Sequence, residues 1–424
     1  MNVLFVHNNF PAQFRHLAQA LAADGANSLA AIGSVTATSM PGVDLRRYIM
    51  PQADLTATHV FARRFDLECR RAEHVLFVAS TLAESGFEPD FVIAHCGWGE
   101  NLPLQAVFPK AKLIIYCEYY YRPEGQDVHF ETEHSRYGID GLTAVRCQNA
   151  STLLALAECD IGLSPTQWQR STYPKEFQSK IHVSHEGVDT GRIRPNPIAK
   201  FILPGGRALT REDEVMTFAA RSLEPMRGFH IFLRAVPEIL RARPDAEVVI
   251  VGADDTSYGP RAPGGGDWKS YCLNEMLPDL DLSRVHFLDR QPHADFLTLT
   301  QISSAHVYLT YPFVLSWSLI EAMSAGCSII ASDTTPVREV IRNGENGVLV
   351  PFGDPGAIAS AVVDVLTDPD RYAHLGINAR RTAVENYDTR LCVPKTLALL
   401  GMAADNGEAD DVDSNPVSPR VATA

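Results

Sequence analysis

The sequence predicts an α/β protein with two doubly wound domains, each built on a parallel sheet. Short apolar segments alternate with longer amphipathic ones along the chain, which is typical of strands covered by helices on both faces. A chain of 424 residues is longer than one ordinary hydrophobic core supports. The alternation breaks at residues 191–206, a stretch rich in proline and glycine. These three observations predict two domains joined by a linker.

The apolar segments predict the strands in order. We expect strands at residues 3–6, 91–95, 113–117, 161–164, 181–184, 216–220, 247–252, 285–288 and 306–310. The first domain is expected over residues 1–195 and the second over 205–385, followed by a helix at 386–401. From residue 402 onward the chain holds five acidic residues, one arginine and little apolar material, which predicts a disordered acidic tail over 402–424.

The overall charge excludes one class of partner. The formal net charge is −14, so sequence-independent binding of nucleic acid phosphates is not expected. Arg63, Arg64, Arg70 and Arg71 form a small basic cluster on a predicted helix. A solvated helix face explains this cluster best, and a weak contact with a membrane surface is the lesser alternative.

Cysteine usage and the lack of long apolar segments indicate a cytoplasmic protein. The eight cysteines are scattered without a C-x-x-C pair, which favours reduced thiols over disulfides or zinc. The first apolar run is too short for a signal peptide, and no segment approaches the length of a membrane span. The sequence leaves the oligomeric state undetermined.

The stretch from Tyr308 to Val350 carries the main ligand signal. It predicts a strand, a turn rich in serine and a helix whose first turn bears Glu321. A helix that opens at a strand end offers unpaired N–H groups and a partial positive charge to a diphosphate, and Glu321 is suited to a ribose diol. The predicted nucleotide contacts at the helix start are Ser316, Ser318, Leu319, Ile320 and Glu321. Ser318 and Glu321 also fit a capping box, and this pair alone does not decide between the two roles.

Two arginines open the second domain. Arg221 ends an apolar strand and Arg227 precedes a glycine at the start of a long helix, so two guanidinium groups are expected to converge on a departing diphosphate. Surface salt bridges are the alternative for either arginine. Gly252 precedes a polar insertion rich in glycine at a strand end, which either lines the site or is simply exposed to solvent.

Polar residues in the first domain follow predicted strands. His95 ends one strand and Glu118 ends the next, so both are candidates to orient a hydroxyl group. Asn8, Asn9 and Gln13 follow the first strand and are candidate acceptor ligands.

These motifs resemble those of the retaining glycosyltransferases of family 4, which have the GT-B fold. Glu321, Ala322, Met323 and Gly326 match the second half of the family's E-x7-E segment, and Arg221 with Arg227 matches R-x5-K-G with arginine in place of lysine. His95 matches the first-domain histidine. The likeness spans about residues 1–400, and residues 285–292 resemble the turn beside the nucleotide base, which gives Asp289 and Arg290 as candidates. Phe313 stands where the family has its first glutamate, the residue associated with hydroxyls of the donor sugar.

The resemblance implies two Rossmann-like domains facing a cleft and a last helix that crosses back to the first domain. It also implies a nucleoside diphosphate sugar as donor, a hydroxyl acceptor and a front-side reaction with retention. No metal and no other cofactor are expected, because the arginines supply the cationic charge. A nucleotide-sugar epimerase or hydrolase of the same fold, or a non-catalytic sugar-binding relative, remains an alternative.

Overall fold

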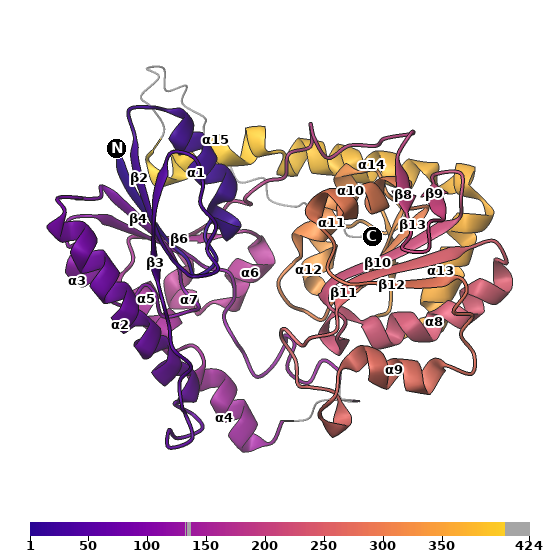
Figure 1. Ribbon diagram of the computed structural model, residues 1–424, viewed down its shortest axis with the longest axis horizontal. Helices are drawn as coiled ribbons and strands as arrows, with labels where there is room; N and C mark the ends of the chain where they lie inside the picture. The colour runs from indigo at the N-terminus through magenta and orange to yellow at the C-terminus, as the bar shows by residue number, and fades with distance from the viewer. Residues whose placement is uncertain (132, 134–136, 403–424) are drawn as a thin grey trace, which may run out of the picture.

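The computed structural model describes residues 1–131, 133 and 137–402 (Figure 1). It contains two α/β domains, each with a parallel sheet between layers of helices. Apart from Met402, the predicted acidic tail lies outside the described residues.

The first sheet has seven parallel strands in the order β3-β2-β1-β4-β5-β6-β7. Residues of β1 alternate between two cores, since Leu4 and Val6 pack on one face of the sheet and Val3 and Phe5 on the other. A strand buried on both faces therefore reads as a continuous apolar run. The strands are β1 Asn2–Val6, β2 Ser28–Ser34, β3 Val43–Tyr48, β4 Phe91–His95, β5 Lys112–Tyr116, β6 Ile161–Ser164 and β7 Ile181–Val183.

The helices of the first domain connect these parallel strands. The longest is α2, which packs against α3, α5 and the edge strand β3. The helices are η1 Ala12–Phe14, α1 Arg15–Ala23, α2 Arg63–Glu84, α3 Leu104–Val107, α4 Ile139–Cys147, α5 Ala150–Glu158, α6 Gln167–Thr172 and α7 Lys175–Gln178.

The second sheet repeats this topology with six parallel strands in the order β12-β11-β10-β13-β14-β15. A short antiparallel hairpin, β8–β9, precedes it and begins inside the stretch predicted as a linker. The strands are β8 Lys200–Ile202, β9 Ala208–Thr210, β10 Val215–Ser222, β11 Glu247–Ala253, β12 Val285–Leu288, β13 Ala305–Tyr308, β14 Ile329–Ser332 and β15 Val348–Val350.

Helices flank the second sheet, and α8 and α13 pack against each other. Ten residues of α8 are buried, among them Phe229 and Phe232, so this helix forms much of the core. The helices are η2 Pro225–Arg227, α8 Phe229–Ala242, η3 Pro263–Gly265, α9 Trp268–Met276, α10 His293–Ile302, α11 Trp317–Ser324, α12 Thr335–Arg338, α13 Pro355–Thr367, α14 Pro369–Tyr387 and α15 Thr389–Leu400.

The last helix returns to the first domain. In Figure 1, α14 lies along the second domain and α15 continues to α1, against which it packs. Ser184 Oγ lies 2.8 Å from Thr396 Oγ1, and Lys112 Nζ donates to the carbonyl of Leu400 at 3.3 Å. The expected α/β class with two Rossmann-like domains and a returning helix is confirmed. The carboxyl ends of both sheets are where open α/β folds place their ligands.

Candidate functional site

Three first-domain candidates form one hydrogen-bonded cluster. Gln13 Nε2 donates to Glu118 Oε1 at 2.8 Å, and His95 Nε2 lies 3.1 Å from Glu118 Oε2. The backbone N–H of Gly97 donates to His95 Nδ1, so Nε2 carries the hydrogen that is donated to the carboxylate. Burial raises the pKa of Glu118, but the hydrogen bonds from His95 and Gln13 outweigh burial and hold this pKa below its ordinary value.

Hydrogen bonds to Glu100 and Thr36 anchor the loop after β1. Glu100 accepts the backbone N–H of Asn8 at 2.9 Å, and the side chain of Asn9 accepts a hydrogen bond from Thr36. Asn8 Oδ1 is buried and makes no hydrogen bond with the described residues. Asn9 is therefore held by its own domain, whereas Asn8 keeps a free acceptor.

His7 belongs beside this cluster, although the sequence interpretation missed it. Its ring centroid lies 5.2 Å from that of His95, with the two rings nearly perpendicular. Burial, together with the charge of His95, lowers the pKa of His7 to about 3. His7 follows the apolar strand β1 directly, and His95 was identified by a similar signal, its position at the end of an apolar strand.

Glu321 faces a cavity and does not cap its helix. The cap of α11 is Ser316, whose side chain accepts the N–H of Ser318 at 3.3 Å. Ser318 is thus inside the helix, and the capping-box alternative is wrong. The carboxylate of Glu321 instead accepts from His293 Nε2 at 2.7 Å. The side chains of Leu319 and Ile320 are fully buried, and the backbone N–H of Leu319 donates to the carbonyl of Ser316 at 3.2 Å.

The two arginines do not converge as free cations. Arg227 is 7% exposed and donates to Thr310 Oγ1 at 2.9 Å and to the carbonyl of Val314 at 3.1 Å. Arg221 is exposed at the end of β10, where its carbonyl accepts a long hydrogen bond from Arg290. The structure therefore gives Arg227 a packing role in the loop before α11, which the sequence did not indicate.

Phe313 forms part of an aromatic wall between the domains. It is 5% exposed, and its ring lies 4.6 Å from that of Tyr119 in the first domain and 5.0 Å from that of Tyr258. The guanidinium group of Arg227 lies 5.5 Å from the rings of both Phe313 and Tyr258. Phe313 is thus covered by its neighbours and is not open to a sugar.

The remaining nucleotide candidates lie at strand ends. Gly252 is buried, and a Cβ there would meet Leu223 Cδ2 at 2.7 Å, so packing alone explains the glycine. Asp289 and Arg290 are exposed, and Arg290 pairs with Asp255 at 2.5 Å. The structure does not bring these residues to the cavity described next.

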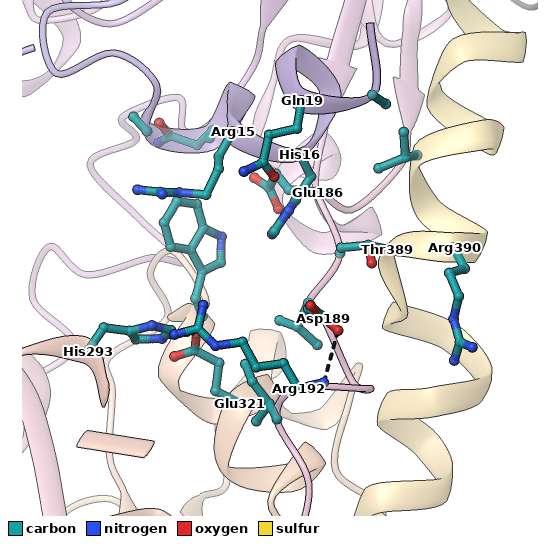
Figure 2. Close-up of a pocket in the computed structure, with 18 of the residues that line it drawn as sticks. Arg15, His16, Gln19, Glu186, Asp189, Arg192, His293, Glu321, Thr389 and Arg390 are labelled. Carbon is teal, nitrogen blue, oxygen red and sulfur yellow. Dashed lines mark hydrogen bonds and ion pairs between the residues drawn. The ribbon is translucent and has the colours of Figure 1, made fainter. Parts of the chain in front are cut away.

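A cavity of about 840 Å³ lies between the domains, bounded by α1, the segment after β7, α11 and α15. In Figure 2, Arg15, His16 and Glu186 lie on the first-domain side of the open centre, and Glu321, His293 and Arg192 lie on the opposite side. Arg390 points away from the centre and pairs with Asp388. The lining includes Ala12, Gln13, Arg15, His16, Gln19, Glu186, Asp189, Arg192, His293, Trp317, Glu321 and Thr389.

Most of this lining was missed by sequence interpretation. Gln13 and Glu321 are the predicted residues that reach the cavity, and Gln13 connects it to Glu118 and His95. Arg15, Glu186 and Trp317 come from separate segments with no shared motif. Glu186 lies in a polar segment that follows a predicted strand, at residues 181–184, which is the same kind of position as those of His95 and Glu118.

Glu186 makes the stability of the fold depend on pH. Burial raises its pKa to about 7. The unfolded chain ionises this group near pH 4.5, whereas the native state keeps the proton to about pH 7, so its contribution to stability falls as pH rises through this window. In Glu186→Gln this loss is absent. We expect the variant to gain on the order of 2 kcal/mol relative to the wild type between pH 5 and pH 8, measured by urea unfolding of both proteins. If the free energies of unfolding of the two proteins change in the same way with pH, the raised pKa of Glu186 is contradicted.

The described residues hold no group of three or more His, Cys, Asp or Glu side chains arranged for a metal ion. Within residues 1–131, 133 and 137–402, no helix is both long and apolar enough to cross a membrane. All eight cysteines are free thiols, and most are buried.

Each of the two domains matches a glycosyltransferase family model. Residues 25–193 match the family described as "Glycosyl transferase family 4 group", and residues 207–382 match "Glycosyl transferases group 1". The fold and these matches define a GT-B glycosyltransferase architecture. The chain belongs to the family 4 glycosyltransferases.

Curated relatives match about half of the chain. A GDP-mannose-dependent alpha-(1-6)-phosphatidylinositol monomannoside mannosyltransferase of Mycolicibacterium smegmatis is 27% identical over 254 residues, covering 55% of this chain and 60% of the relative. A phosphatidyl-myo-inositol mannosyltransferase of the same organism is 32% identical over 42% of each chain. A D-inositol 3-phosphate glycosyltransferase of Rhodococcus jostii is 29% identical over 48% of this chain and 46% of the relative. The chain therefore spans about half the length of these relatives.

Solved structures match nearly the whole fold. HepE of Anabaena, determined with UDP and glucose, has a TM-score of 0.69 at 15% identity and covers 95% of this chain and 100% of its own. Sucrose-phosphate synthase of Thermosynechococcus elongatus has a TM-score of 0.73 at 16% identity, covering 95% of this chain and 98% of its own. These likenesses establish the GT-B fold.

Proposed function

We propose that this protein transfers a glycosyl group from a nucleoside diphosphate sugar to a hydroxyl group of an acceptor. The observation that carries the proposal is the cavity in which Glu321 of the second domain faces Gln13 of the first, because Gln13 leads through Glu118 to His95. Such a cleft, with polar groups from both domains, is typical of a small-molecule site. The name of one relative includes GDP-mannose, and HepE was determined with UDP, which supports a nucleotide-sugar donor.

In this proposal each side of the cleft has its own task. Glu321 holds the ribose diol, and the positive end of the α11 dipole stabilises the leaving diphosphate, since the N–H groups of Ser318 and Leu319 already donate to Ser316. His95 and Glu118 orient the acceptor hydroxyl or the donor sugar. Retention at the anomeric carbon follows from the family resemblance, with the leaving phosphate oxygen taking the acceptor proton. The chemistry as proposed uses no metal or other cofactor, and the cytoplasmic location remains a prediction.

The aromatic wall favours a second candidate. Because Phe313 replaces a carboxylate and is buried under Tyr119 and Tyr258, the chain is also a candidate for a nucleotide-sugar-binding relative without transferase activity.

One experiment separates the candidates. The protein is incubated with a panel of nucleotide sugars, with and without polyol, sugar and inositol acceptors, and the products are identified by mass spectrometry and NMR. A glycosylated acceptor with retained configuration supports the proposal. Epimer formation without an acceptor indicates an epimerase, and nucleotide-sugar binding without any product indicates the non-catalytic relative. Failure to bind any nucleotide sugar overturns the proposed donor site.

Glu321→Gln tests the ribose contact. We expect the nucleotide affinity to fall about 10-fold or more, because a charge-assisted hydrogen bond contributes roughly 1.5–3 kcal/mol. The helix start should remain intact because Ser316, not Glu321, caps it. Calorimetry measures the affinity and thermal unfolding measures the fold, with Glu385→Gln on α14 as the exposed control. A large drop in melting temperature with unchanged affinity would return Glu321 to a structural role.

A further inference from the structure

Glu186 presents an unused carboxylate oxygen to the cavity. Its side chain is 7% exposed, and Tyr116 donates its hydroxyl hydrogen to Oε1. Oε2 makes no hydrogen bond of ordinary geometry with the described residues, although the Trp317 side chain is close enough to lower the pKa of Glu186. His185 Nδ1 lies 3.6 Å from Oε2 but already accepts the N–H of Gly187, so the neutral ring cannot donate. A buried oxygen in this position calls for a donor from a ligand.

An aromatic face lines the same cavity. Trp317, the first residue of α11, is 41% exposed although it is one of the largest apolar side chains. An indole left open beside a cavity offers a stacking surface to a flat ring. Its position at the start of α11 places it four residues before Glu321, the proposed ribose contact.

Two unpaired cations complete the lining. Arg15 begins α1 and Arg192 lies in the segment between the domains. Neither guanidinium group makes a hydrogen bond or ion pair with any residue that the structure describes. Both are exposed, so they remain available to carbonyl or phosphate oxygens of a ligand. Figure 2 shows them on opposite sides of the open centre.

Base chemistry discriminates among the ligands that such a lining accepts. Guanine presents two adjacent donors, N1–H and the N2 amino group, and carries its acceptors O6 and N7 on the neighbouring edge. Uracil places its single N–H between two carbonyl oxygens, which a carboxylate repels. Adenine and cytosine each place a ring acceptor beside their amino group. A carboxylate for the donor edge and an arginine for O6 and N7 therefore select guanine.

We propose that this cavity binds the guanosine part of a GDP-sugar donor, with Glu186 Oε2 accepting from the guanine donor edge and Trp317 stacking on the base. Arg15 and Arg192 supply the positive charge for O6 and N7 and for the diphosphate. The inference depends on the proposed transferase function, since it names the nucleotide that the donor site selects. Glu186 acts here as a specificity residue and not as a catalytic one.

The test measures the affinities of GDP and UDP for the full chain by calorimetry at pH 8, above the pKa of about 7 for Glu186, where this group is ionised and Oε2 can accept hydrogen bonds. We expect the wild type to bind GDP about 10-fold or more tightly than UDP. In Glu186→Gln the GDP affinity falls by about that factor while the UDP affinity hardly changes, so the preference disappears. Trp317→Ala should lower the affinities for both GDP and UDP, because stacking does not depend on the hydrogen-bonding edge of the base. Glu158→Gln, at an exposed position of α5, is the matched control.

The outcomes separate this inference from the proposed function. The guanine assignment is overturned if the wild type binds UDP more tightly than GDP, or if Glu186→Gln lowers the affinities for both nucleotides equally. Transfer from a UDP-sugar would still support the transferase function. If the wild type binds no nucleotide and transfers no sugar, both proposals fail. If Glu186→Gln does not fold, two other measurements decide. These are the ratio of GDP to UDP affinity in the wild type and the same ratio in Glu186→Asp, which keeps the charge on a shorter side chain.

Discussion

Replacing Arg227 by alanine is expected to lower the free energy of unfolding by about 2–4 kcal/mol and to remove most transferase activity. The guanidinium group donates to Thr310 and to the carbonyl of Val314 in a buried setting. It also lies over the rings of Tyr258 and Phe313. Removing a buried charged donor leaves these acceptors unsatisfied and opens a void. Because the affected loop leads directly into α11, the proposed diphosphate contacts shift with it.

Urea unfolding and initial transfer rates measure the two effects of Arg227→Ala. Arg241→Ala, at an exposed position on α8, is the control and should change neither quantity appreciably. Arg227→Lys keeps the charge but loses the planar fork, so it should recover only part of the stability. Wild-type stability in Arg227→Ala would show that the buried contacts of this arginine do not hold the loop.

Glu118→Gln is expected to reduce kcat about 100-fold, within the range for loss of a positioned polar group in an active site. The carboxylate accepts from Gln13 and from His95, and a glutamine amide turns its NH₂ group toward one of these two donors. His95 then loses its fixed orientation. The fold should change little, since the Glu118 side chain is 27% exposed.

Steady-state kinetics separates positioning from structure in this variant. A lowered kcat with an almost unchanged melting temperature agrees with the role assigned to Glu118, and Glu176→Gln on α7 provides a control at an exposed position. Unchanged kcat in Glu118→Gln would remove the first-domain cluster from the reaction.

Much of the fold was predictable because buried parallel strands are locally apolar. The strands at residues 91–95, 161–164 and 285–288 have the bounds that the sequence predicted. The strands β2 and β3 were missed for opposite reasons. The segment Ser28–Ser34 is rich in alanine and glycine, which have little strand preference. The segment Val43–Tyr48 is an edge strand whose exposed residues are charged or polar.

The site was less predictable, because it depends on contacts between distant segments. His95, Glu118 and Gln13 come together because the carboxyl ends of neighbouring parallel strands meet at one edge, which the sequence pattern implies. Nothing near Arg227 in the sequence indicates that Phe313 and Tyr258 cover it. Glu186 acquires its character from Tyr116 and from burial, and both follow from the packing of the whole domain.

The central claim is that the cavity beside Glu321 and Trp317 holds the nucleotide of the donor. A crystal structure with a saturating nucleoside diphosphate tests it most directly. The account predicts density for the nucleotide in this cavity, with the ribose hydroxyls within hydrogen-bond distance of the Glu321 carboxylate. A nucleotide bound elsewhere on the protein, with this cavity empty, would contradict it.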